Sequence, residues 1–282
     1  VWGIRHRATV AKTSRWPRIR TGTGGTVEAS HRVTTGGTEV ELDRARVLVT
    51  GGARGSGAAL ARAYAGAGAD VVVAARASDE LEAVAAEVGG RAVAVDLTDS
   101  VAVESLVPGV EADYGPIDVL INNAGINKNA PFVEIDPNTF QLIQQVNVFA
   151  PFMLCQAAIQ SMKHKGWGRI VNVSSIWGKI CMAGRASYSA SKFALDGMTS
   201  TLAVEYAADG IIANSISPGF INTDLTHRML GNKEIQALVS KVPIGRLGKV
   251  EEIARLVLWL SSEENTFISG QNIAIDGGFT RV

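Results

Sequence analysis

From residue 46 onward, short apolar runs alternate along the chain with longer segments whose apolar positions recur at helical spacing. The apolar runs are nearly continuous in Val, Ile and Ala, without regular polar residues between them. Such runs are typical of strands that are covered on both faces, as in a parallel sheet. They predict strands over residues 46–50, 70–75, 92–95, 118–122, 169–174, 211–216 and 272–275.

The segments between these runs predict helices. They cover residues 56–66, 79–88, 100–114, 137 towards 164, a stretch around 188, and 249–261, with Pro108 expected to disturb the third. Strands that alternate with helices in this way form α/β folds. The pattern therefore predicts a single-domain, Rossmann-type, doubly wound parallel sheet with helices on both faces.

Composition sets this domain apart from the start of the chain. The 282 residues are 46% hydrophobic, enough for one large core. Residues 1–43 have no periodicity, and the first 40 carry seven basic residues against two acidic ones. We expect residues 1–43 to be a disordered or irregular extension without a chemical role, with an Arg-rich targeting leader as one alternative. The folded Rossmann-type domain is expected over residues 44–282.

Charge and cysteine content exclude several functions. The remaining chain carries 20 basic and 25 acidic residues, so it has no basic stripe for nucleic acid. Cys155 and Cys181 stand in no metal-ligand spacing, so no metal site is predicted, and both are expected to be reduced and buried. Such sparse cysteine favours a reducing, cytoplasmic location. No apolar run reaches the roughly 18 residues of a membrane span.

A glycine-rich turn, TGGARGSG over residues 50–57, follows the first strand and opens the first helix. A dinucleotide pyrophosphate needs a tight turn, close backbone approach and free N–H groups at a helix N-terminus. The residues predicted to provide these features are Gly51, Gly55, Ser56 and Gly57. Glycine turns also occur for packing alone, but here the strand–turn–helix context is met.

Two arginines bear on the choice of nucleotide. Arg54 lies inside the glycine turn, and Arg76 follows the second strand where an acid would select NAD. Guanidinium groups suit a ribose 2′-phosphate, so NADP(H) is favoured and NAD(H) stays possible. The alternative is that both are solvated surface arginines.

Two further strand ends are expected to contact the cofactor. Asp96, followed by Leu97, ends the third strand, where its carboxylate would accept from the adenine amine; the alternative is a helix N-cap. The fourth strand ends in Asn122-Asn-Ala-Gly125, in which Asn123, Ala124 and Gly125 allow close backbone approach. A plain turn is the alternative there.

Tyr188 and Lys192 lie four residues apart, on one face of a predicted helix. A nearby ammonium group would lower the tyrosine pKa from about 10 towards neutrality. The phenol would then exchange a proton with a substrate oxygen. A solvated helix face is the alternative for such a pair taken alone.

Taken together, these stretches resemble the short-chain dehydrogenase/reductase family from about residue 47 to residue 282. The resemblance includes the serine strand VNVSS at 171–175, Pro218-Gly219 with Thr223 beyond it, and the terminal Asp276-Gly-Gly. Several motifs in fixed order are far more specific than any one of them. Ser56 departs from the family, which most often has an apolar residue at that position.

The resemblance implies a role for each of the catalytic candidates. Tyr188 would be the general acid in reduction and the base in oxidation, and Lys192 would hold the nicotinamide ribose. Ser175, favoured over the adjacent Ser174, would bind the substrate carbonyl, and Asn147 would support a water chain to Lys192. Pro218, Gly219 and Thr223 would anchor the nicotinamide end. Trp177 and Met182 are candidate pocket walls.

The expected activity is NADP(H)-dependent interconversion of a ketone and a secondary alcohol. The chain is similar to 3-oxoacyl-carrier-protein reductases and to gluconate and sugar-alcohol dehydrogenases, and its sequence does not separate acyl from polyol substrates. The resemblance also implies a homo-oligomer, tetramer or dimer, built from the helices over 140–162 and 188–206. The alternative is a catalytically silent, cofactor-sensing or scaffold protein, against which the intact set Asn147, Ser175, Tyr188 and Lys192 argues.

Overall fold

The computed structural model describes residues 40–223, 226 and 231–282, and the expected extension lies almost wholly outside these residues. Contacts within the chain define one compact unit over Glu39–Val282. Leu42 is 4% exposed and belongs to its core, with its backbone N–H donating to the carbonyl of Ala67. The folded unit therefore begins before residue 44, the boundary expected from the sequence.

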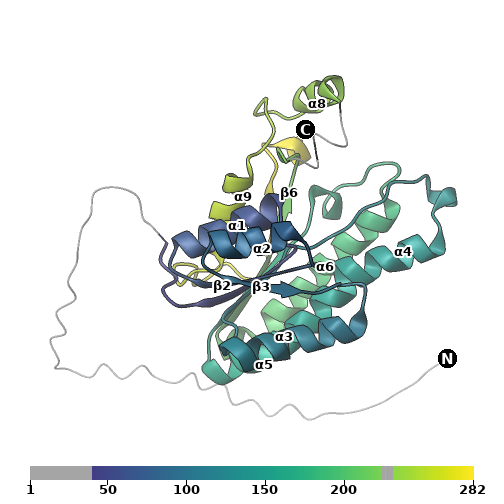
Figure 1. The fold of residues 1–282 in the computed structure, drawn as a ribbon. Helices are drawn as coiled ribbons and strands as arrows, with labels where there is room; N and C mark the ends of the chain where they lie inside the picture. Colours follow the sequence, from purple (N-terminus) through teal and green to yellow (C-terminus); the bar gives the residue numbers. More distant parts are fainter. Residues whose placement is uncertain (1–39, 224–225, 227–230) are drawn as a thin grey trace, which may run out of the picture. The chain divides into compact units, whose positions relative to one another are not determined.

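The described residues form a seven-stranded sheet of order β3-β2-β1-β4-β5-β6-β7, in which every pairing is parallel (Figure 1). This confirms the predicted doubly wound Rossmann-type fold, and the strand bounds differ by one or two residues from those expected. The strands are β1 Arg46–Thr50, β2 Asp70–Ala75, β3 Arg91–Ala94, β4 Val119–Asn122, β5 Gly168–Val173, β6 Ile211–Pro218 and β7 Asn272–Ile275.

The helices confirm the predicted alternation. They are α1 Gly55–Gly66, α2 Asp79–Glu87, α3 Ser100–Tyr114, α4 Pro137–Gln144, α5 Ala150–Lys165, α6 Ala186–Glu205, α8 Asn232–Val239 and α9 Val250–Leu260, with short helical turns η1 Phe132–Glu134, η3 Ile176–Gly178, η4 Ala207–Asp209 and η5 Phe279–Arg281. Helix α8 was not predicted. Helix α3 continues through Pro108, because this residue lies on the exposed face, where the carbonyl left without a partner can bond to water.

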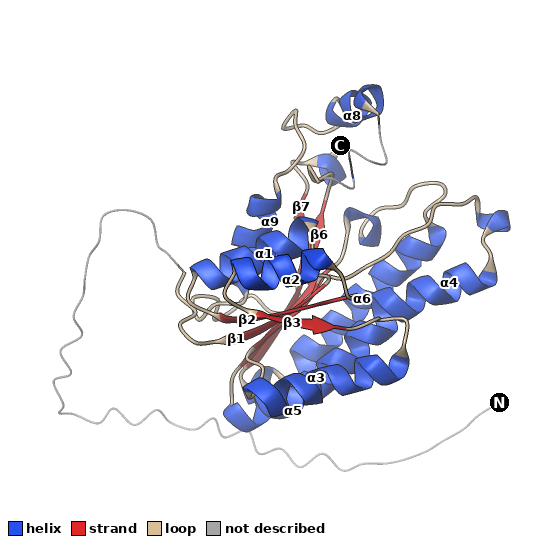
Figure 2. Cartoon of the chain, in the orientation of Figure 1, coloured by secondary structure: helices blue, strands red, loops and turns tan. Residues whose placement is uncertain are grey.

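Two apolar cores hold the layers together, one on each face of the sheet. Helices α1, α2 and α9 lie on one face (Figure 2), where they pack against alternate strand residues such as Val47 and Val49. Helices α3, α5 and α6 cover the other face, against the intervening residues such as Leu48. Burial on both faces explains why the strands read as continuous apolar runs.

The long helix expected after residue 137 is interrupted. A π-helical turn, η2 Gln145–Phe149, joins α4 to α5. Pro151 explains it, because proline has no N–H to donate to the carbonyl of Asn147 and its ring crowds that carbonyl. Single π-turns inside helices occur often at functional sites.

By length and composition, the helical stretch Pro137–Lys165 could cross a membrane, because an 18-residue window within it has a mean hydropathy of 1.4. No such run was expected from the sequence. Half of this window is buried inside the protein, which is usual for a core helix of a globular domain. The expectation for the cysteines holds for one of the two: Cys155 is buried and Cys181 is exposed in the loop that follows η3.

Candidate active site

The glycine turn after β1 and the turn after β4 meet at the carboxyl ends of the strands, where the order of the sheet reverses. Gly51 has φ +65°, and a Cβ on it would lie 2.8 Å from Cα of Ala124. Asn123 locks the two turns together, because its Nδ2 donates to the carbonyls of Thr50 at 2.9 Å and Gly51 at 3.2 Å. Only a residue without a side chain fits at Gly51.

The start of α1 is open for an anion. Gly55 has φ +56° and nothing within 4 Å of an added Cβ, so the space beside it is free. Arg54 provides no side-chain cap, and the first turn, which includes the partly buried Ser56, holds no acid. The N–H groups at this helix end are thus available to a phosphate, and the site fits the pyrophosphate of a dinucleotide.

Arg54 and Arg76 are exposed, and neither forms a hydrogen bond or salt bridge with another residue in the described ranges. The backbone N–H of Thr98 donates to Asp96 at 2.9 Å and is the main cause of the lowered pKa of Asp96, to which the charge of Arg76 adds. The N-cap alternative for Asp96 is wrong, because Asp99 caps α3. Leu97 packs on the core under this edge.

Ser175 and Tyr188 come together from two segments. The hydroxyl of Ser175 is within hydrogen-bonding reach of the Tyr188 hydroxyl and counteracts the rise of its pKa. Ser175 is held at the N-cap of η3, where its Oγ accepts from the backbone N–H of Trp177 at 3.2 Å. The Ser174 side chain instead contacts α6, where its Oγ donates to the backbone carbonyl of Lys192 at 3.4 Å. The structure therefore brings Ser175, and not Ser174, beside the tyrosine.

The pKa of Tyr188 moves in the direction opposite to that expected from the sequence. Burial raises it, and the Ser175 hydroxyl and the charge of Arg185 counteract only part of this rise. The correction has a simple cause: spacing along a helix shows that Lys192 is near, but it does not show how far the phenol is removed from water.

Lys192 lies on the same helix face as Tyr188, as expected, with Nζ 5.5 Å from the ring centroid. The side chain is 3% exposed, and Nζ donates to the carbonyl of Val173 at 2.8 Å. Burial lowers its pKa to about 8, against the opposing charge of Asp196 one turn further on. The pKa of Asp196 is raised by its own burial.

This buried ammonium predicts a pH-dependent stability. Below pH 8 both the folded and the unfolded protein carry the charge, and the folded state bears the full cost of burying it. Between about 8 and 10.5 the folded state loses the proton first, so stability rises with pH in that window. In Lys192→Met no titratable group stands at this position, so the pH dependence due to Lys192 is absent. The difference in unfolding free energy between wild type and Lys192→Met should therefore shift in favour of wild type by about 1–3 kcal/mol from pH 7 to pH 10.5, as measured by urea unfolding. An unchanged difference would contradict the burial of a charged Lys192.

Asn147 is fully buried in the π-helical turn. Its side-chain amide accepts from the backbone N–H of Ile126 at 2.8 Å and donates to the carbonyl of Ile126 at 2.9 Å and to Oγ of Ser191 at 3.0 Å. A Cβ on Gly125 would lie 3.4 Å from Oδ1 of Asn147 and 3.5 Å from Nζ of Lys192. The structure thus gathers these two polar groups around the glycine.

The segment after β6 forms the other side of the site. A Cβ on Gly219, which follows Pro218, would lie 2.8 Å from Cα of Asp276, so the chain passes close to the end of β7. Oγ1 of Thr223 accepts from the backbone N–H of Thr226 at 3.2 Å. All the predicted site residues therefore lie within the described part of the chain.

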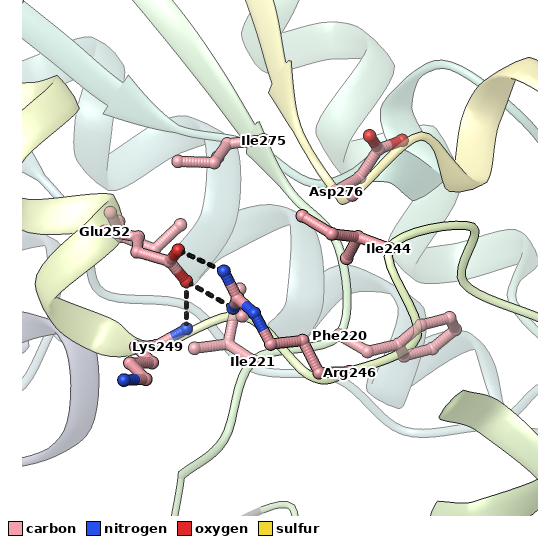
Figure 3. A pocket seen from close by; sticks show the side chains of 11 residues that line it. Phe220, Ile221, Ile244, Arg246, Lys249, Glu252, Ile275 and Asp276 are labelled. Carbon is pink, nitrogen blue, oxygen red and sulfur yellow. Dashed lines mark hydrogen bonds and ion pairs between the residues drawn. The ribbon is translucent and has the colours of Figure 1, made fainter. Parts of the chain in front are cut away.

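A hollow of about 180 Å³ lies next to this segment, between the end of β6, α9 and β7. Figure 3 shows the Glu252 carboxylate receiving two bonds from the Arg246 guanidinium, at 2.6 and 2.8 Å, and one from the backbone N–H of Lys249 at 2.7 Å. These bonds lower the pKa of Glu252 to about 2. The Ser175 and Tyr188 side chains do not line this hollow.

Three aromatic side chains pack together beside the hollow, and one of them, Phe220, lines it. Trp177 is 7% exposed and lies edge-to-face with Phe220 and Phe279, each at a centroid distance of 6.3 Å. Met182, the other wall candidate, is 55% exposed. Sequence reasoning missed Arg185, whose charge acts on Tyr188; its place three residues before the tyrosine was the available signal.

Comparison with known proteins identifies the family of this chain. A family model described as enoyl-(acyl carrier protein) reductase matches residues 51–280. The chain is 36% identical to gluconate 5-dehydrogenase of Gluconobacter oxydans, over 85% of this chain and 96% of the relative. It is 40% identical to acetoacetyl-CoA reductase of Shinella zoogloeoides, over 82% and 96%.

A solved structure is also similar. The putative NAD(P)-dependent gluconate 5-dehydrogenase of Beutenbergia cavernae, with bound NADP at low occupancy, superposes with a TM-score of 0.82 and 32% identity, over 86% of this chain and 99% of that one. The family match covers most of the folded unit, and the fold agrees with it. The chain therefore belongs to the short-chain dehydrogenase/reductase family of oxidoreductases.

Proposed function

We propose that the protein is an NADP(H)-dependent enzyme that interconverts a ketone and a secondary alcohol. The observation that carries this proposal is the meeting of the Tyr188 and Ser175 hydroxyls above the buried ammonium of Lys192. A phenol beside a second hydroxyl suits a carbonyl oxygen that must gain a proton and be held while charge develops on it.

In this mechanism the side chains act on the oxygen of the substrate. Ser175 donates to the carbonyl and fixes its orientation, and Tyr188 gives it a proton in reduction or removes one in oxidation. Lys192 keeps a positive charge beneath the phenol, which favours the phenolate form against burial. Asn147 holds the segment at Ile126, beside the lysine, in place. The nicotinamide, when bound, supplies or accepts the hydride.

The cofactor assignment rests on the open start of α1 and on the two unpaired arginines at the adenosine end. A 2′-phosphate would give both guanidinium groups a partner. The similar protein of Beutenbergia cavernae, solved with NADP, supports the same choice. NAD(H) is the alternative nucleotide.

Arg76→Ala should change the nucleotide preference. We expect kcat/KM for NADPH to fall by about 10- to 100-fold while that for NADH changes little, because only the 2′-phosphate loses a charged partner. Steady-state rates with both nucleotides measure this ratio. If wild type prefers NADH, or if the ratio is the same in the variant, the assignment of Arg76 is wrong.

Two substrate classes follow from the relatives. One relative is named for gluconate, a sugar acid, and the other for acetoacetyl-CoA, a 3-oxoacyl thioester. The direct test is NADPH oxidation, followed at 340 nm, with 5-keto-D-gluconate and acetoacetyl-CoA among a panel of ketones. Turnover of at least one ketone supports the proposal, and no turnover across the panel favours a protein that binds the cofactor without catalysis.

We also propose a cytoplasmic homo-oligomer. The exposed Phe149 and Phe152 at the start of α5 stack at a centroid distance of 6.1 Å, and Phe193 and Val204 on α6 are also exposed. Ile143 and Val146, which precede Phe149 in the same helical stretch, lie in the core. Burial of exposed aromatic side chains against a second copy would remove them from water. Light scattering on the eluted protein gives the oligomeric state.

A further inference from the structure

Arg185 places a positive charge beside the candidate active site, and no carboxylate among the described residues pairs with it. It lies just before α6, and its partly buried guanidinium carbon is 5.6 Å from the ring centroid of Trp177. Its charge also acts on the hydroxyl of Tyr188. Within the described ranges, no hydrogen bond or salt bridge joins this guanidinium to another residue. Burial lowers the pKa of Arg185, and the charge of Tyr188 opposes this shift.

Arg169 shows how this fold satisfies an arginine that serves structure. Arg169 is 5% exposed and lies 4.5 Å from the ring centroid of Trp167, a similar stacking contact. Its guanidinium also donates, at 3.0–3.3 Å, to the backbone carbonyls of Gly168, Gly210, Ser262 and Asn265. Arg185 has the stacking contact but, among the described residues, lacks these acceptors. Its side-chain nitrogens are not closed off from solvent, so its N–H donors stay available to a partner that the described chain does not supply.

The position of that partner is tied to the reacting oxygen. Trp177, on which Arg185 stacks, is fixed by Phe220 and Phe279, and its backbone N–H bonds to Oγ of Ser175. The Arg185 guanidinium and the two hydroxyls that act on the substrate oxygen therefore lie on one side of the site, held by the packing around Trp177. A group bound by Arg185 would belong to the same small molecule as the carbonyl.

We propose that Arg185 is a specificity-determining residue that binds a carboxylate of the substrate near the reacting carbonyl. The inference rests on the proposed function and narrows it: the substrate is an oxo acid or the matching hydroxy acid, such as a keto sugar acid. A planar guanidinium with several free N–H donors matches a carboxylate in two parallel bonds. A neutral polyol offers it no charge.

A competing role for Arg185 is purely electrostatic, as a positioning residue that favours the Tyr188 phenolate. The charged groups near the phenol are Arg185 and Lys192, with Lys179 and Asp196 further along. A loss of this effect would lower the rates with all ketones alike and move the basic limb of the pH profile upward. Loss of carboxylate binding would act on anionic substrates alone, which separates the two roles.

The test compares matched substrates in wild type and Arg185→Gln. The pairs are 5-keto-D-gluconate with L-sorbose, and acetoacetate with ethyl acetoacetate, each with NADPH. The ratio of kcat/KM for the anion to that for the neutral partner should fall by about 10- to 100-fold in at least one pair, since a charged hydrogen-bonded contact is lost. Arg185→Lys, which keeps the charge without the fork, should give an intermediate ratio. Arg91→Gln is the control, because Arg91 stacks on Tyr114 at 4.7 Å at the opposite end of the strands.

A binding measurement keeps this inference separate from turnover. With saturating NADP⁺, D-gluconate should raise the Tm of wild type and of Arg91→Gln, and should raise that of Arg185→Gln much less. A gluconate-dependent shift without turnover of any ketone would overturn the proposed function and leave carboxylate binding in place. Unchanged substrate ratios in Arg185→Gln, or equal Tm shifts in all three proteins, would overturn the role of Arg185.

Discussion

Replacing Tyr188 by phenylalanine should lower kcat by about a thousandfold with any ketone that the wild type reduces. The structure places the Tyr188 phenol, an acidic side chain, beside the Ser175 hydroxyl, and positioned acid–base groups contribute about 10²–10⁴ to a rate. The loss should appear in kcat and in kcat/KM together, because the proton moves only in the transition state.

The variant should fold and bind nucleotide as the wild type does. The Tyr188 hydroxyl of the wild type is expected to contribute little to stability, because burial raises its pKa and the Ser175 hydroxyl offsets only part of this rise. Removing it exposes no new polar group and leaves the ring in place. Tm and the NADPH dissociation constant, measured by fluorescence, are the controls. A variant with normal folding that retains more than about a tenth of wild-type kcat would rule out Tyr188 as the proton donor.

Most of this fold follows from features that a sequence displays directly. A strand covered on both faces must be apolar throughout, so the run Val71–Val72–Val73 marks β2 without further information. Because the strands are parallel, whatever follows each of them gathers at one edge. The glycine turn, Asn123 and Ser175 were therefore expected together although they are far apart in the chain.

What the sequence could not supply depends on burial and on local exceptions. Four-residue spacing placed Lys192 near Tyr188, but the direction of the tyrosine pKa was wrong because desolvation exceeds the nearby charges. The π-turn at Asn147 was missed, although Pro151 is its visible cause. Arg185 was missed for a different reason: only the structure shows that its guanidinium lacks acceptors, whereas Arg169 has them.

Gly57→Ala should be the most destabilising glycine-to-alanine substitution in the cofactor-binding half of the domain. A Cβ on Gly57 would lie 2.2 Å from the carbonyl oxygen of Gly51 and 2.7 Å from Nδ2 of Asn123. The first of these atoms is backbone and cannot rotate away, so the turn itself must open. We expect the free energy of unfolding to fall by about 2–4 kcal/mol, as in other cases of overpacking against a rigid neighbour.

The same displacement should weaken nucleotide binding, because the turn that opens is the one that must approach the pyrophosphate. A loss of about 3 kcal/mol in binding free energy corresponds to roughly 100-fold weaker affinity for NADPH. Gly66→Ala is the matched control in the same helix: an added Cβ there meets nothing within 4 Å, and alanine is the better helix former, so stability should stay equal or rise by up to about 1 kcal/mol. Urea unfolding and NADPH titration of both variants decide the matter. If Gly57→Ala matches Gly66→Ala in both measurements, then the contact between the first turn of α1 and Gly51 is not what shapes the cofactor site.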